Sequence, residues 1–168
     1  SITLGPRIIE LDRCIRECDP VLNAAIVPMQ TLAQHTGLEA FISKLYGHSV
    51  ISIHTGSDQL APPAGHGRGR PMPITKGSSS KGLVAFLPAA RLRRLYSGTQ
   101  SADLPSWEEF YESAQQIRRA GYCRTSGELF DGKTGITAPI FGRSGLVVAS
   151  ITVFGDDVRF SLFNEDRI

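Results

Sequence analysis

The amino-acid sequence predicts an α+β fold in which helices pack on an antiparallel sheet. Two helical patterns come first, a hairpin pattern follows, and then come further helical patterns and a second hairpin. The chain has 168 residues, of which 41% are hydrophobic and 20% charged, and this suits one domain with a single core. Helices that alternate with antiparallel hairpins in this way are typical of α+β proteins.

The composition excludes several classes of function. The net charge is only +2 and the Lys and Arg residues are scattered, so we do not expect this chain to bind DNA by itself. No apolar run approaches the length that a bilayer requires, and the N-terminus lacks the pattern of a secretion signal. The three cysteines form no Cys-x-x-Cys pair, and no metal-ligand spacing appears. We therefore expect a cytoplasmic domain with no cofactor, no metal and no membrane contact.

A helix is expected within residues 1–18. Apolar residues recur there at alternating intervals of four and three, which is the spacing of a coiled-coil or bundle seam. They are Leu4, Ile8, Leu11, Ile15 and Cys18. The seam fits either a connecting helix or a helix that covers the domain.

A second helix begins at Asp19 and Pro20, which suit the N-cap and the first helical position. Gly37 is expected to end it. The predicted buried face carries Leu22, Ile26, Met29, Leu32 and Ala33.

A β-hairpin is predicted next, from residues 39–45 and 49–54 on either side of a Tyr-Gly-His turn. The following residues, 55–69, contain two prolines and four glycines and predict a long loop. This loop is either a lid over a site or a surface insertion.

The functional prediction depends on residues 70–88. Gly77 permits a tight turn, and the serines at positions 78–80 are expected to supply N-cap hydroxyls to a helix. The apolar residues of that helix are Leu83, Val84, Phe86 and Leu87. The first backbone N–H groups of a helix have no internal acceptor and sit at the positive end of its dipole. We therefore predict that they hold a carboxylate.

Further helices and strands follow this segment. Residues 88–96 predict a basic helix with a solvated face. Ser106 and Glu109 form a capping box that starts another helix, which ends at Gly121. Its inward residues are expected to be Trp107, Phe110, Ala114 and Ile117. A short strand over 122–125 and a hairpin made of 136–141 and 146–154 complete the pattern.

The last strand has two different faces. Its apolar face carries Val147, Ala149, Ile151 and Val153, and we expect this face to build the core. Its other face carries Ser150, Thr152 and Phe154. Hydroxyls beside an aromatic wall are typical of small-ligand sites, so this face is predicted to line a pocket.

Several segments together resemble the effector-binding domain of the isocitrate-lyase-regulator (IclR) family of bacterial transcription factors. The serine-rich turn and its apolar helix resemble the signature of that family, and other matches follow in the expected order over nearly the whole chain. They are residues 4–8, 117–122, 127–129, 136–141 and 147–155. The family usually has Thr-Ala before a Gly-Lys pair, whereas this chain has Ser78-Ser79-Ser80-Lys81-Gly82.

The resemblance implies a GAF-like fold and a sensor function. It implies that residues 1–18 are a connecting helix, that residues 19–168 are the effector-binding domain, and that a winged helix-turn-helix lies outside this sequence. The expected partners are a small organic acid and further copies of the chain, as a homodimer or homotetramer. DNA would be contacted only through the absent N-terminal domain, and the acid would change DNA affinity allosterically.

The expected effector site combines the serine-rich turn with the later strands. The backbone amides of Ser78, Ser79 and Ser80 would hold the acid, with Thr152 assisting. Further candidates near the effector are Thr125, Glu128, Gly135, Phe154, His54 and Cys123. For Glu128, which lies in the family's Gly-Glu-Leu motif, a purely structural role as a cap of loop amides stays open. Two aromatic residues, Phe154 and Phe130, favour an aromatic or otherwise bulky acid.

Two other classes of function stay open. Ser78-x-x-Lys81 and Lys133-Thr-Gly135 resemble motifs of penicillin-recognising enzymes, although the third motif is missing and the chain is short. We interpret this resemblance as accidental. The first alternative that stays open is a GAF-like enzyme with Ser80 or Cys123 as nucleophile. The second is a dimerisation module whose pocket is filled by its own side chains.

Overall fold

A computed structural model describes residues 5–56, 67–101 and 103–161 of the chain. Six strands form one antiparallel sheet in the order β3-β2-β1-β6-β5-β4. The strands are β1 (Glu39–Tyr46), β2 (Ser49–Thr55), β3 (Pro71–Met72), β4 (Cys123–Ser126), β5 (Lys133–Phe141) and β6 (Val147–Asp156). The predicted α+β fold with an antiparallel sheet is confirmed.

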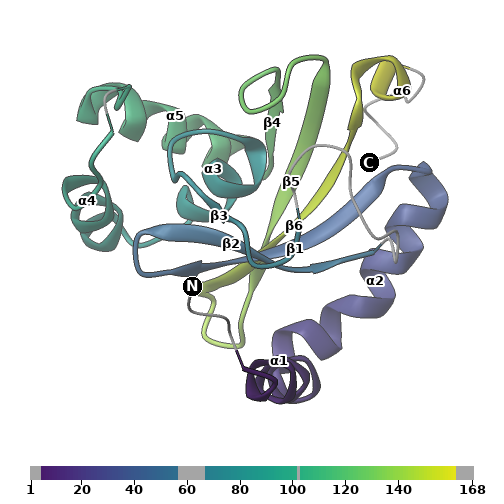
Figure 1. The fold of residues 1–168 in the computed structure, drawn as a ribbon. Helices are drawn as coiled ribbons and strands as arrows, with labels where there is room; N and C mark the ends of the chain where they lie inside the picture. The colour runs from purple at the N-terminus through teal and green to yellow at the C-terminus, as the bar shows by residue number, and fades with distance from the viewer. Residues whose placement is uncertain (1–4, 57–66, 102, 162–168) are drawn as a thin grey trace.

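Six helices are described around this sheet (Figure 1). They are α1 (Arg7–Cys18), α2 (Pro20–Thr36), α3 (Ser78–Val84), α4 (Ala89–Ser97), α5 (Trp107–Ala120) and α6 (Asp157–Ser161). Both predicted hairpins are present, as β1–β2 and β5–β6. Of the predicted loop at 55–69, residues 57–66 lie outside the described residues.

The helix α2 begins and ends where the sequence indicated. The side chain of Asp19 accepts hydrogen bonds from the backbone N–H groups of Val21 (2.9 Å) and Leu22 (3.2 Å). Gly37 ends the helix in the left-handed conformation, with φ 62°. Asp19 also pairs with Lys44 of β1, with Nζ and Oδ2 2.5 Å apart, so the start of α2 is fixed to the sheet.

The sheet divides the interior into two cores rather than the single core that the chain length predicted. The core between α2 and the sheet contains Leu22, Met29, Ile42 and Val153. The core on the other side, under α3, α4 and α5, contains Val50, Leu83, Val84, Leu92 and Phe110. Because both faces are covered, the apolar burial that stabilises the fold is split between them.

One prediction about β6 is wrong. Val147 packs in the core with α3 and α5, whereas Ala149 and Val153 pack in the core with α2. The pairing with β5 shifts between Ile140 and Phe141, which marks an irregularity of the β-bulge type. An extra residue reverses the alternation of a strand. Val147 therefore faces the opposite side from the rest of its predicted apolar set.

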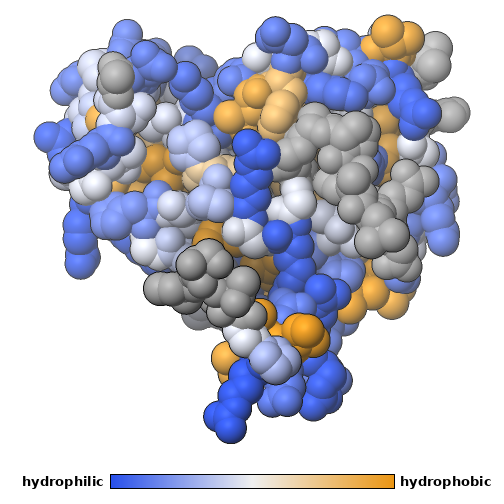
Figure 2. All heavy atoms as spheres, viewed as in Figure 1, coloured by the Kyte–Doolittle hydropathy of each residue, from blue (hydrophilic) through white to orange (hydrophobic). Residues whose placement is uncertain are grey.

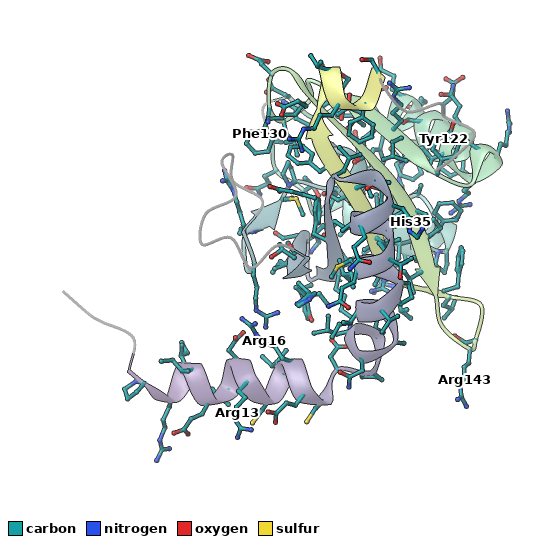
Figure 3. All side chains as sticks on the ribbon, turned by 90° about the vertical axis from the view of Figure 1, so that its right-hand side faces the viewer. Arg13, Arg16, His35, Tyr122, Phe130 and Arg143 are labelled. Carbon is teal, nitrogen blue, oxygen red and sulfur yellow. The ribbon has the colours of Figure 1, made fainter. Side chains whose placement is uncertain are left out.

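The helix α1 stands apart from the body of the domain (Figure 3). None of its residues is buried, and the described members of the predicted seam are exposed by 46% (Ile8), 61% (Leu11) and 53% (Ile15). At the lower end of the molecule, where α1 lies, exposed hydrophobic residues alternate with hydrophilic ones (Figure 2). Leu4, the first residue of the predicted seam, lies outside the described residues.

Candidate ligand-binding site

The site is organised by α3, which lies directly on the sheet. Gly82 permits this close approach, because a Cβ atom there would lie only 2.8 Å from Cγ2 of Thr137 on β5. Ser150 of β6 donates a hydrogen bond through its hydroxyl to the carbonyl of Ser79 (3.2 Å). The prediction that the serine-rich helix faces the hydroxyl-bearing side of β6 is therefore confirmed.

The predicted capping of α3 by serine hydroxyls is wrong. The N-cap is Gly77, with φ 81°, and no side chain caps the helix. The three serines at positions 78–80 lie inside the helix and are at most 5% exposed. The hydroxyl of Ser79 donates to the sulfur of Met72 (3.4 Å), and that of Ser80 has no partner among the described residues. Packing against the sheet turns these side chains inward, away from the capping position.

The sequence also predicted that the first backbone N–H groups of α3 have no acceptor within the helix, and the structure agrees with this. The first helical hydrogen bond is donated by the backbone N–H of Lys81 to the carbonyl of Gly77 (3.1 Å). Among the described residues, no hydrogen bond is donated by the N–H groups of Ser78, Ser79 and Ser80. This is the usual state of the first residues of a helix.

A carboxylate of the protein itself lies beside this turn. Oε2 of Glu128 accepts a hydrogen bond from the backbone N–H of Gly77 (2.9 Å). Oε1 of the same group accepts from Nζ of Lys81 (2.8 Å). The Lys81 and Glu128 side chains are 22% and 32% exposed, so the pair is partly shielded from water. Glu128 therefore connects the segment between β4 and β5 to both ends of the first turn of α3.

A small hollow lies between α3, β5, β6 and the segment that follows β4. Its volume is about 20 Å³, which is room for about one water molecule. Three phenylalanines contribute to its wall, and two of them, Phe130 and Phe154, meet edge to face with ring centroids 6.2 Å apart. The lining residues are Phe41, Gly77, Ser78, Ser79, Thr125, Glu128, Leu129, Phe130, Lys133, Gly135 and Phe154.

Six of the predicted site residues line this hollow. They are Ser78, Ser79, Thr125, Glu128, Gly135 and Phe154. Five lining residues were not among the predicted site residues. Gly77 was predicted only as a turn and Phe130 only as a sign of a bulky ligand, and Phe41, Leu129 and Lys133 were missed. Phe41 belongs to a predicted strand, but the sequence alone gave no signal that this strand would neighbour β6 in the sheet.

The other four predicted residues lie elsewhere. Ser80 lies on the fully buried face of α3. Thr152 shares a hydrogen bond with Thr137, and their Oγ1 atoms are 2.8 Å apart. His54 pairs across the sheet with Ile42. Cys123 lies under α3, where burial raises the pKa of its thiol to about 11.

The charged groups of the hollow are already paired. Lys81 pairs with Glu128, and Lys133 pairs with Asp156, with Nζ and Oδ1 2.5 Å apart. The hydrogen bond from Lys133 lowers the pKa of Asp156 below its usual value. A negatively charged ligand would therefore meet two ammonium groups and the N–H of Gly77, which already have an acidic partner, and the N–H groups of Ser78, Ser79 and Ser80, which do not.

In residues 5–56, 67–101 and 103–161, no three His, Cys, Asp or Glu side chains are grouped so that they could hold a metal ion. In the same ranges, no helix is long and apolar enough to cross a membrane.

Comparison with known protein families gives one match that covers most of the chain. Residues 17–168 match the family described as "Bacterial transcriptional regulator IclR C-terminal". The chain is 25% identical over 172 residues to the HTH-type transcriptional regulator XynR of Escherichia coli (strain K12), with 96% of this chain and 68% of XynR covered. It is also 25% identical over 175 residues to KdgR of the same organism, with 100% of this chain and 64% of KdgR covered.

A solved structure supports the same fold. The inducer-binding domain of the transcription factor PobR from Acinetobacter, solved as a double mutant in complex with 3-hydroxybenzoic acid, superposes with a TM-score of 0.71. The sequence identity is 20%, and the match covers 86% of each chain. At this identity the similarity concerns the fold.

Proposed function

The chain belongs to the IclR family of bacterial transcriptional regulators, as their C-terminal effector-binding domain, and we propose that it senses a small aromatic carboxylic acid in the hollow beside α3. Because the chain spans about two thirds of XynR and of KdgR, the activity of the longer protein is part of this proposal. We infer that it acts in the cytoplasm and reaches DNA through a domain outside this sequence.

The observation that carries the proposal is that the turn at the start of α3 already binds a carboxylate of the protein itself, that of Glu128. The N–H of Gly77 and the ammonium of Lys81 both donate to the carboxylate of Glu128, at 2.9 and 2.8 Å. Hydrogen bonds between charged donors and carboxylates are stronger than neutral ones. The arrangement is therefore chemically suited to an acid.

The walls of the hollow favour an aromatic acid. Phe41, Phe130 and Phe154 present three rings, and rings prefer edge-to-face or offset contacts with one another. The bound 3-hydroxybenzoic acid of PobR, a protein of similar fold, supports the same class of ligand. Thr152 is not part of the proposed contact surface, because its hydroxyl is paired with Thr137.

Ligand binding must enlarge the hollow. A volume of about 20 Å³ is far below the roughly 300–1,000 Å³ of pockets that enclose drug-sized ligands. The side chains of Phe130 and Leu129 come from a connecting segment rather than from a helix or strand, so they are the walls that can move most easily.

Such a change is the basis of the proposed regulation. A ligand alters an equilibrium between two arrangements only if it binds them unequally. Acid that binds the enlarged form would shift a homodimer or homotetramer toward one arrangement and thereby change the DNA affinity of the longer protein. Phe130, which lines the hollow, lies at the end of the domain away from α1, so the signal would travel along the sheet (Figure 3).

The small volume also favours a second candidate, a dimerisation module that binds no ligand. An enzyme with Cys123 as nucleophile is disfavoured, because a pKa of about 11 keeps the thiol protonated at neutral pH. Ser80 is fully buried, and no base lies within hydrogen-bond distance of its hydroxyl among the described residues.

Thermal unfolding in the presence of four small molecules separates the sensor from the dimerisation module. Benzoate and 3-hydroxybenzoate should raise the melting temperature, whereas benzamide has the ring without the acid and acetate has the acid without the ring. At a concentration of 100 Kd a ligand stabilises by about 2.7 kcal/mol, which corresponds to roughly 5–10 °C for a chain of this size. If benzoate and 3-hydroxybenzoate leave the melting temperature unchanged, the sensor proposal for aromatic acids is wrong.

A further inference from the structure

We propose that Glu128 is an internal competitor of the effector, which keeps the site closed until the carboxylate of a ligand replaces its own. This inference rests on the proposed function, and it adds a mechanism by which binding changes the structure. It concerns one side chain and its two donors, Gly77 and Lys81.

The Gly77 donor cannot serve two carboxylates at once. The backbone N–H of Gly77 has one hydrogen and donates it to Oε2 of Glu128, and Lys81 is bonded to Oε1 of the same group. Two carboxylates that share one site repel each other. An acid that uses the Gly77 N–H must therefore displace Glu128 from it, and repulsion between the two carboxylates favours the loss of Glu128 from Lys81 as well.

The displaced residue carries part of the wall with it. Glu128 is followed directly by Leu129 and Phe130, and all three side chains line the hollow. Leu129 also packs so closely over Gly77 that a Cβ atom on that glycine would collide with its side chain. Movement of Glu128 away from α3 thus shifts Leu129 and Phe130 outward and supplies the volume that an aromatic ring needs, while Phe41 and Phe154 stay in place on their strands.

The base of this segment is held independently of Glu128. The backbone N–H of Gly127 donates to the carbonyl of Lys133 (2.9 Å), and the N–H of Asp157 donates to the carbonyl of Gly132 (3.0 Å). The hydroxyl of Thr134 donates to Oδ1 of Asp157 (2.6 Å). Because the base is tied to β5 and α6, loss of the Glu128 contacts would release the tip of the segment while the strands stay paired.

Replacement of Glu128 by glutamine tests the inference. Glu128→Gln keeps the size of the side chain but removes the charge that binds Lys81. We expect the Kd for benzoate, measured by isothermal titration calorimetry, to fall about tenfold, the lower end for the loss of a hydrogen bond between charged groups. Asp131→Asn is the matched control, since Asp131 is an exposed acid of the same segment that contacts neither Gly77 nor Lys81.

Each outcome distinguishes the inference from the proposed function. Tighter benzoate binding by Glu128→Gln, with no change in Asp131→Asn, supports the competitor. Unchanged or weaker binding by Glu128→Gln, while the wild type binds, overturns the competitor and leaves the sensor intact. Equal tightening of benzoate binding in both variants also overturns it, because the lost negative charge alone would then explain the gain. The same holds if Glu128→Gln binds the neutral benzamide more tightly to the same degree, because added volume would then explain it.

Two further results are possible. If neither the wild type nor Glu128→Gln binds benzoate, the proposed function fails and the inference fails with it. If Glu128→Gln does not fold, Glu128→Ala is measured in the same way, and a Kd equal to or higher than that of the wild type overturns the inference.

Discussion

The hydroxyls of Thr137 and Thr152 lie 2.8 Å apart on neighbouring strands, and both residues are almost completely buried under α3. The pair satisfies two polar groups that would otherwise be buried without a partner. It also explains why Thr152, which the sequence placed at the effector, contributes to the packing of α3 on the sheet and does not line the hollow.

The threonine pair predicts a non-additive effect on stability. Thr152→Val leaves the hydroxyl of Thr137 buried and unpaired, which costs about 1–3 kcal/mol of unfolding free energy. The double variant Thr137→Val/Thr152→Val replaces both partners by side chains of the same shape and should regain most of that loss. Urea unfolding of the wild type, both single variants and the double variant measures both effects. A double variant as unstable as the sum of the two single variants would contradict the pairing.

Gly77 is predicted to be required for ligand binding as well as for stability. It combines φ 81° with ψ 145°, a region that only glycine uses readily, so Gly77→Ala should cost about 1–3 kcal/mol. The added methyl group would also displace Leu129 from the hollow and change benzoate affinity. Gly121→Ala is the control, because φ there is 82° and no atom lies within 4 Å of the added carbon. Equal benzoate affinity in both variants would contradict the proposed site.

The pair formed by Asp19 and Lys44 predicts a loss of stability in acid. Burial acts to raise the pKa of Asp19, but the hydrogen bonds from Lys44 and from the N–H groups of Leu22 and Val21 outweigh it and lower the pKa. A lowered folded-state pKa means that the stabilisation is complete above the ordinary value near 3.9 and is lost as the pH falls through the folded value.

Asp19→Asn isolates this contribution, because asparagine still caps the helix but carries no charge. We expect the variant to be about 1 kcal/mol less stable than the wild type at pH 7, with the difference shrinking as the pH falls below about 4. Urea unfolding at several pH values measures it. A difference that stays constant down to the acid limit would show that the charge of Asp19 contributes nothing.

The cysteines provide a test of the enzyme alternative within one molecule. Cys123 is buried, and burial raises its pKa to about 11, whereas Cys14 and Cys18 on α1 are exposed. Iodoacetamide at neutral pH should therefore modify the two exposed cysteines and leave Cys123 unmodified until urea is added. Mass spectrometry of the peptides reports each site. Selective modification of Cys123 in the folded chain would favour a nucleophile there.

Local signals in the sequence predicted many of the elements. The N-cap at Asp19 and the αL glycine at position 37 determine where α2 begins and ends, and both depend only on neighbouring residues. The capping box is equally local: Ser106 accepts from the N–H of Glu109 (3.2 Å), and Glu109 accepts from the N–H of Ser106 (2.8 Å). Such interactions need no tertiary structure and can therefore be inferred from the sequence.

Features that depend on contacts between distant residues were predicted less well. The serines of α3 were expected to cap the helix, but the sheet beneath them offers burial and partners such as Met72 and Ser150. Val147 changed face because of an irregularity in pairing, which alternation alone cannot reveal. Phe41 lines the hollow because β1 pairs with β6, a neighbour more than a hundred residues away in sequence.

The central claim, that the hollow beside α3 binds an aromatic acid, is tested most directly by NMR of the chain during titration with 3-hydroxybenzoate. The largest changes in backbone amide shifts are expected at Gly77, Ser78 and Ser79 and at Leu129 and Phe130. No change at any ligand concentration, or largest changes at residues outside this lining set, would contradict the claim.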